Sequence, residues 1–213
     1  MAVYDLRDMG LTHAYLYYTG RSFHLMDGQR TNDMTRGGEI ISTGGNPRLW
    51  YGTYTLAANT HAAQRGIMAL LRSISEEGSY VLISDPTFEG FPIDTARLQN
   101  VNPNDTSLIR ISGIGTRRFV IGDYISFGYG GGRRAFHQIA QNQGAPTGGV
   151  TPWMKVVPPL REGYTADGTV GVTTSFPELA AKIVPGSIAG GDANGGASDG
   201  VSFDWIQTLE SVA

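Results

Sequence analysis

Short runs of β-forming residues, nearly all bounded by Gly, Pro, Asn or Asp, dominate this sequence of 213 residues. Bounded runs of this kind predict strands joined by tight turns. The 30 glycines and 10 prolines supply the turn residues that so many strands need. The runs are 15–19, 22–26, 39–43, 50–56, 79–84, 107–111, 119–127, 135–140, 154–157 and 169–174. They predict a mainly β fold, an antiparallel β-sandwich or barrel.

One segment departs from this pattern, because its apolar residues recur at the period of one face of an α-helix. Asn59 or Thr60 can cap its start, and Gly78 can end it. The apolar stripe consists of Ala63, Ile67, Leu70, Leu71 and Ile74. The sequence therefore predicts one amphipathic helix, at about residues 60–75, that packs on a sheet through this stripe.

Changes in composition suggest three parts. Residues 1–98 are expected to form an N-terminal β-sandwich with the helix, and residues 99–185 a second, barrel-like β domain. Residues 186–200 have the Gly, Ser, Asp and Asn content of a flexible connector. Residues 201–212 fit a helix or a strand, and they can dock on their own domain or on a neighbouring subunit. We expect residues 186–213 to be a tether with an extended C-terminal arm.

Charge and composition exclude several classes of protein. The net charge is −3, and the 16 basic residues give no overall positive field for a nucleic-acid backbone. The chain has no cysteine, so disulfides and thiolate metal sites are excluded. No apolar run is long enough to cross a bilayer, and the first residues do not resemble a signal peptide. We therefore expect no specific nucleic acid and no membrane insertion.

The sequence motifs do not converge on a catalytic centre. Gly113-Ile114-Gly115 has Arg118 where a dinucleotide fingerprint needs its third glycine, so a hairpin turn explains it better. The four histidines are scattered without metal-ligand spacing. An enzyme of this size usually carries a cluster of acid, base or nucleophile residues. We therefore predict a protein that is not an enzyme, with no catalytic, cofactor-binding or metal-binding residues.

Three groups of elements follow one another in a distinctive order, over about residues 47–185. A strand, the helix and a strand ending in Asp-Pro come first, a Gly-Asp turn that starts a strand comes second, and a hairpin with a Pro-Pro-Leu-Arg strand end comes third. The residues of these motifs are Trp50, Asp85, Pro86, Gly122, Asp123, Pro158, Pro159, Leu160 and Arg161. The ordered combination resembles the distal tail protein family of long-tailed bacteriophages and gene transfer agents.

This resemblance implies a structural virion protein, assembled in the host cytoplasm, that forms a homo-hexameric ring at the distal end of a phage tail. The ring would join the tail tube protein to hub or tip proteins, with the tape-measure protein ending near its lumen. The arginine side chain forms bidentate hydrogen bonds with carboxylates, and an aromatic side chain can hold a terminal arm on a neighbouring subunit. Both residue types therefore suit contacts between subunits. The candidate interface residues are Arg117, Arg118, Arg133, Arg134, Phe203 and Trp205.

Three alternatives remain open. Another tail ring component, a tube or terminator protein, would share the small β-sandwich with one helix. A carbohydrate-binding β-sandwich would stack sugars on Trp50, Trp153 or Trp205, although large rings are more often buried. A tail-tip glycoside hydrolase or peptidase is least favoured, because no acid–base pair is visible in the sequence.

Overall fold

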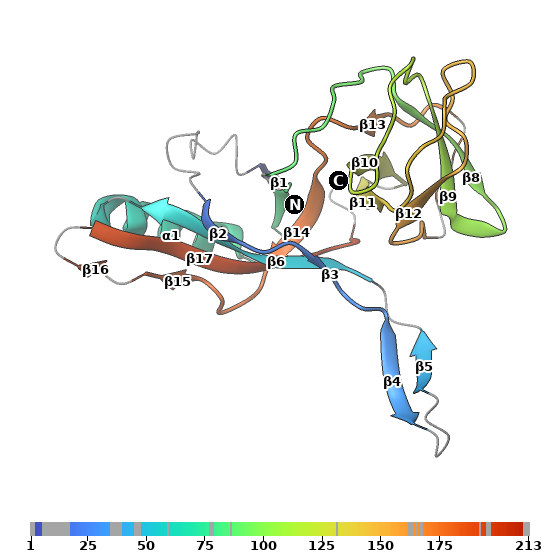
Figure 1. The fold of residues 1–213 in the computed structure, drawn as a ribbon. Helices are drawn as coiled ribbons and strands as arrows, with labels where there is room; N and C mark the ends of the chain where they lie inside the picture. The colour runs from blue at the N-terminus through green and yellow to red at the C-terminus, as the bar shows by residue number, and fades with distance from the viewer. Residues whose placement is uncertain are drawn as a thin grey trace. The chain divides into compact units, whose positions relative to one another are not determined.

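The structure is a computed structural model, and the chain divides into two compact units, neither of which is continuous in sequence. Residues 1–12, 74–182 and 208–213 form one, here called the barrel unit; residues 13–73 and 183–207 form the other, the helix unit. The residues described are 3–5, 18–34, 40–44, 48–58, 60–76, 79–85, 87–130, 132–161, 164, 166, 168–191, 193–194 and 197–210. Among them are seventeen strands and one helix, so the mainly β prediction is confirmed. Figure 1 shows both units.

Most strands of the helix unit pair with the long strand β6 (Trp50–Ala58) or with its partner β17. Its alternate residues, from Trp50 to Ala58, are buried, as expected of a strand with one face on a core. The other strands of this unit are β2 (Tyr18–Arg21), β3 (His24–Leu25), β4 (Gln29–Met34), β5 (Ile40–Gly44), β15 (Ala189–Gly190), β16 (Ala193–Asn194) and β17 (Ala197–Gln207). β17, β2 and β3 pair with β6, and β15 and β16 pair with β17.

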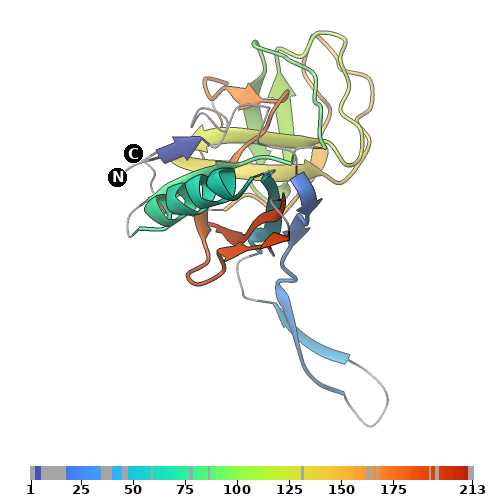
Figure 2. The same ribbon diagram turned by 90° about the vertical axis from the view of Figure 1, so that its left-hand side faces the viewer.

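The predicted helix is present as α1 (His61–Ile74), within a residue of the expected limits. Thr60 caps it, since the Thr60 Oγ1 accepts a hydrogen bond of 3.1 Å from the Ala63 amide. Ile67, Leu71 and Ile74 are buried, whereas Leu70, which the sequence placed on the same stripe, is only half-buried. The Gln64 side chain donates to the Gly191 carbonyl at 2.8 Å and so ties α1 to the segment after β15. Figure 2 shows α1 from a second side.

The expectation of an extended C-terminal arm is wrong for residues 201–207. They belong to β17, which pairs antiparallel with β6 over most of its length, with Trp205 opposite Gly52. Phe203 and Trp205 are each 1% exposed and pack on Tyr54 at ring centroid distances of 6.0 and 5.7 Å. These aromatic residues fill the core of the helix unit, because a large ring gains most by burial there.

Part of the Gly-rich segment predicted as a connector forms strands. Gly200 has a φ of +100°, and a Cβ at this position would overlap the Leu56 carbonyl of β6. Only glycine combines that backbone conformation with so close an approach. The glycine at this position therefore allows close strand packing, although the composition around it favoured a flexible linker.

The barrel unit holds a six-stranded sheet that is nearly closed. Its strands are β8 (Arg97–Asn102), β9 (Asp105–Ser112), β10 (Tyr124–Tyr129), β11 (Arg133–Ile139), β12 (Met154–Val157) and β13 (Val172–Thr173), in the order β13-β10-β11-β12-β9-β8. The Leu98 amide donates to Val170 and the Val172 amide to Ala96, which brings the two ends of the sheet together. Fourteen buried residues, among them Ile109 and Phe127, fill its interior.

Three further strands of this unit are β1 (Val3–Asp5), β7 (Tyr80–Ile83) and β14 (Leu179–Ile183). β1 runs parallel to β7, and β14 runs antiparallel to it. Tyr80 donates to the Glu210 carboxylate at 2.7 Å, and Lys182 donates to the same oxygen at 2.7 Å. This contact fixes the residues after β17 beside β7 and β14. The boundary that the sequence suggested near residue 98 falls inside β8, which is the last strand in the order of the barrel unit's six-stranded sheet.

Candidate interaction surfaces

The Gly122-Asp123 motif forms a tight turn before β10. The Asp123 amide donates to the Val120 carbonyl at 3.1 Å, and Gly122 has a φ of +100°, which together define a type II turn. The Asp123 carboxylate accepts from the Val120 amide at 2.9 Å, and its burial raises the pKa of this carboxyl above the ordinary value. The strand predicted over 119–127 therefore begins only at Tyr124, because the turn occupies its first half.

This turn exposes apolar side chains instead of burying them. Ile121 occupies the second position of the turn and is 63% exposed, and Val120 is 52% exposed. The Ile121 amide donates to the Asn142 side chain at 2.8 Å, and the Gly122 amide to the Ile139 carbonyl at 2.9 Å. The turn is thus held firmly with two apolar side chains facing solvent.

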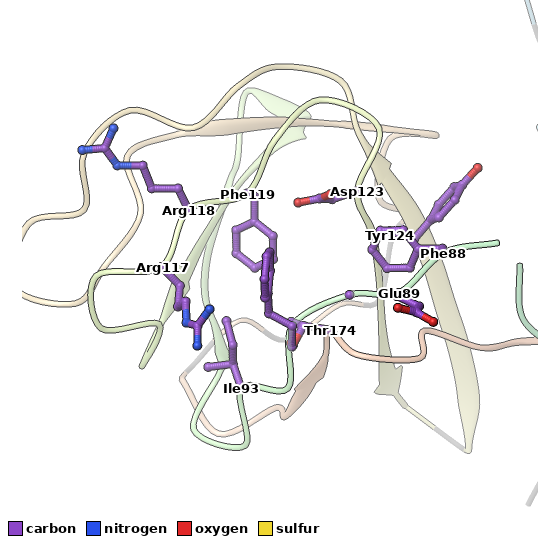
Figure 3. Close-up of a pocket in the computed structure, with 11 residues that line it drawn as sticks. Phe88, Glu89, Ile93, Arg117, Arg118, Phe119, Asp123, Tyr124 and Thr174 are labelled. Atoms are coloured by element: carbon purple, nitrogen blue, oxygen red, sulfur yellow. The ribbon is translucent and has the colours of Figure 1, made fainter. Parts of the chain in front are cut away.

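A small hollow lies beside the turn (Figure 3). Its walls come from three segments: the loop before β8, the segment 117–124, and the residues after β13. The lining residues are Phe88, Glu89, Gly90, Phe91, Ile93, Arg117, Arg118, Phe119, Asp123, Tyr124 and Thr174. Phe91 is 52% exposed and carries the Arg117 guanidinium 5.0 Å from its ring centroid. Of the predicted interface residues, Arg117 and Arg118 therefore line an apolar hollow.

The second arginine pair is placed differently. Arg133 and Arg134 begin β11 beside the end of β10, where Tyr129 is the partner of Arg133. Arg134 makes an ion pair of 2.9 Å with Glu178 in its own unit, and the Arg133 guanidinium lies 6.0 Å from the Tyr129 ring centroid. Arg134 is therefore engaged within the chain, and Arg133 remains exposed.

Pro158, Pro159, Leu160 and Arg161 close the barrel after β12. The Leu160 side chain is 3% exposed, and its amide donates to the Thr106 carbonyl at 2.9 Å. Pro158 follows a cis peptide bond and is buried, and Pro159 is exposed. The Pro158 carbonyl accepts a hydrogen bond of 2.7 Å from the His137 ring. These residues form part of the barrel's packing.

His137 is the residue that sequence reasoning missed in this region. It is 2% exposed, its ring is stacked on Phe127 at 5.6 Å, and its Nε2 atom has no hydrogen-bond partner among the described residues. Burial lowers the pKa of His137 from 6.5 to about 4, against the effect of the Pro158 hydrogen bond and with a smaller contribution from Arg161. His137 has no other histidine or carboxylate at a characteristic spacing in the sequence, so no sequence pattern could have identified it.

The remaining motif residues also have structural contacts. Trp50 is 3% exposed, packs on Phe23 at 5.3 Å, and its amide donates to the Gln207 side chain at 3.2 Å. The Asp85 carboxylate accepts from the Thr87 amide at 2.8 Å, a turn that Asp commonly makes. Pro86 lies outside the described residues.

The three tryptophans differ in exposure. Trp50 and Trp205 are buried at 3% and 1%, so neither offers a ring face to a sugar. Trp153 is 38% exposed, and the Arg110 guanidinium lies over its ring at 4.6 Å. Of the three rings considered for stacking, only that of Trp153 reaches the surface.

In the described part of the chain, no three His, Cys, Asp or Glu residues come together as metal ligands. No helix within these residues is long and apolar enough to span a membrane. In comparisons with known proteins, no family model and no curated protein matches the chain.

Proposed function

We propose that this chain is a structural ring subunit of a virion, placed at the distal end of a phage tail between the tail tube and the hub or tip proteins. The motif order described above suggests this family. The observation that supports the proposal is the β4–β5 hairpin, because the edges of these two strands suit strand addition by a neighbouring subunit.

Neither β4 nor β5 has a second strand partner among the described residues. The two strands pair with each other. A lone two-stranded hairpin is only marginally stable in water, so a further strand would stabilise it. The same pairing is how one chain adds a strand to another.

The sequence of β5 leaves its edge unprotected. Proteins usually blunt an exposed edge with charges or proline, which prevents pairing with other chains. β5, with the sequence Ile-Ile-Ser-Thr-Gly, contains neither, whereas β4 carries Arg30 and Asp33. The outer edge of β5 is therefore the better site for a neighbour's strand, and repetition of such a contact generates a ring when the rotation closes.

Immunogold electron microscopy of whole particles, with an antibody against this chain, tests the assigned place. We expect label at the distal end of the tail, together with an assembled form of the chain that is built from hexameric rings. Particles that contain no copy of this chain would overturn the proposal.

The contact itself is tested by placing a charge on the β5 edge. Ile41→Lys should lower the assembled mass measured by light scattering, because a lysine on the edge opposes strand addition. Asn32→Lys on β4 is the matched control, since that strand already carries charges. Equal masses for wild type and Ile41→Lys would remove the hairpin as the ring contact.

A second candidate function, carbohydrate binding, now depends on Trp153 alone. Its exposed ring offers a stacking platform for a sugar, although Arg110 occupies one face. Glycan-array binding that disappears in Trp153→Ala would favour this function over the ring.

A further inference from the structure

Exposed apolar side chains are concentrated in the chain segments that border the hollow of the barrel unit. Six large apolar side chains are exposed among the described residues, and four of them lie in the segments around this hollow. They are Phe91, which lines the hollow, Val120 and Ile121, which lie in the turn between the lining residues Phe119 and Asp123, and Phe176, two residues after the lining residue Thr174. Apolar side chains that collect at one place on a surface usually mark a binding site, whereas scattered ones do not.

The hollow is preformed. Gly90 donates to the Ser175 carbonyl at 3.1 Å, and the Thr174 hydroxyl donates to the Phe91 carbonyl at 2.5 Å. A Cβ on Gly90 would overlap the Thr174 carbonyl, so the two segments approach as closely as backbone allows. Together with the bonded turn at Val120, these contacts hold the apolar side chains in place and reduce the ordering cost of binding.

Charges flank the hollow with opposite signs on its two sides. Figure 3 shows Arg117 and Arg118 on one side of the Phe119 ring and Glu89 and Asp123 on the other. Arg118 and Glu89 are both exposed, and within the described part of the chain neither has an ion-pair partner. The hollow thus has a positive side, an apolar middle and a negative side.

We propose that this hollow is a two-fold contact between two copies of this chain. A surface with a positive side, an apolar middle and a negative side is complementary to itself after a rotation of 180°, which sets Arg118 of each copy against Glu89 of the other. The apolar side chains then cover each other at the centre, where water is excluded. This contact goes beyond the proposed ring, because it lies in the other unit and joins copies with a different symmetry.

Charge exchange tests the contact, and sedimentation equilibrium of the full chain measures it. In the Arg118→Glu variant, the new carboxylate of each copy faces Glu89 of the other copy, so the symmetric pair contains two repulsive contacts. In the Glu89→Arg variant, two pairs of cations repel each other in the same way. Each variant alone should weaken self-association about tenfold or more. An equimolar mixture of the two variants should restore it, since every contact between unlike copies is again attractive. Arg133→Glu, at an exposed arginine away from the hollow, is the matched control and should leave association unchanged.

Each outcome decides the proposal. Rescue by mixing supports the two-fold contact, since only a second copy can supply the complementary charge. Weakening without rescue, or a wild-type chain that never self-associates, would overturn it, and so would variants that associate as the wild type does. The ring proposal is tested separately by Ile41→Lys: if that variant still forms dimers that Arg118→Glu dissociates, the two-fold contact stands without the ring.

Discussion

Protonation of His137 should destabilise this protein in mildly acidic solution. Its ring is buried between Phe127 and Tyr164, with Arg161 near enough to oppose a positive charge. The pKa is about 4 in the folded chain and 6.5 for an unperturbed histidine. The unfolded chain therefore binds a proton that the folded chain does not bind in the range between these values.

The sign and size of the effect follow from this difference. Above about pH 7 both states are neutral at this position, so His137 does not change the free energy of unfolding with pH. As the pH falls below about 6.5, that free energy should drop by about 1.4 kcal/mol per pH unit, and the loss should stop near the folded pKa. The total is about 3 kcal/mol. Asp105 and Glu210 have pKa values below the ordinary carboxyl range, so their losses come at lower pH.

Urea unfolding followed by tryptophan fluorescence, over this pH range, measures the slope. His137→Gln keeps an amide donor for the Pro158 carbonyl and removes this titration, so its free energy of unfolding should no longer fall between pH 6.5 and about 4. The raised pKa of Asp123 acts in the opposite direction, because there the folded chain binds the extra proton. His24→Gln, at an exposed histidine, should retain the wild-type slope. The reasoning would be refuted by an equal slope in wild type and His137→Gln, or by an NMR titration that places the pKa of His137 near 6.5.

Three further changes test the packing of the helix unit. Leu71→Ala, at a fully buried position of α1, should lower the free energy of unfolding by about 2 to 5 kcal/mol, whereas Arg65→Ala on the exposed face should change it little. Gly200→Ala should cost more than Gly115→Ala in thermal unfolding, because both have positive φ but only the first would overlap a neighbouring backbone. Deletion of residues 201–213 should unfold the helix unit, as seen by circular dichroism, since it removes most of β17; a folded unit with unchanged melting temperature would contradict this role of the strand.

The elements that sequence reasoning predicted well are those defined by local signals. Each of these signals lies within a short stretch of the chain. They are the cap at Thr60, the apolar period of α1 and the β-forming run that begins at Trp50, and the structure has all three where expected. Periodicity alone did not distinguish Leu70 from the more deeply buried Leu71, because both lie on one face of the helix.

The elements that were missed depend on contacts between distant residues. Pairing of β17 with β6 joins segments about 150 residues apart, and no local pattern around Trp205 specifies a partner at that distance. The Gly-rich composition favoured a tether, although at Gly200 the reason for glycine is the close approach of β6.

The candidate surface at the hollow was only partly visible in the sequence. The Gly122-Asp123 turn and the pair Arg117 and Arg118 were identified, but Ile121 was included in the strand predicted over residues 119–127. Ile121 is exposed because it occupies the second position of the type II turn, where its side chain faces solvent. The contribution of Glu89 depends on a loop that approaches from elsewhere in the chain, so it could not be predicted.

The two proposed contacts together constrain the symmetry of the assembly. Addition of a neighbour's strand other than β5 to the edge of β5 is a head-to-tail contact, and head-to-tail contacts that close give a ring with a single axis. The hollow is a contact of the same surface with itself, so it can only join copies related by a two-fold axis. A ring whose members also pair in this way must have dihedral symmetry, with two rings joined face to face. Arg118→Glu should then leave single rings with half the mass of the assembled wild-type protein. Ile41→Lys should instead leave two-fold pairs. The mass of the product that each variant leaves therefore shows which surface makes which contact.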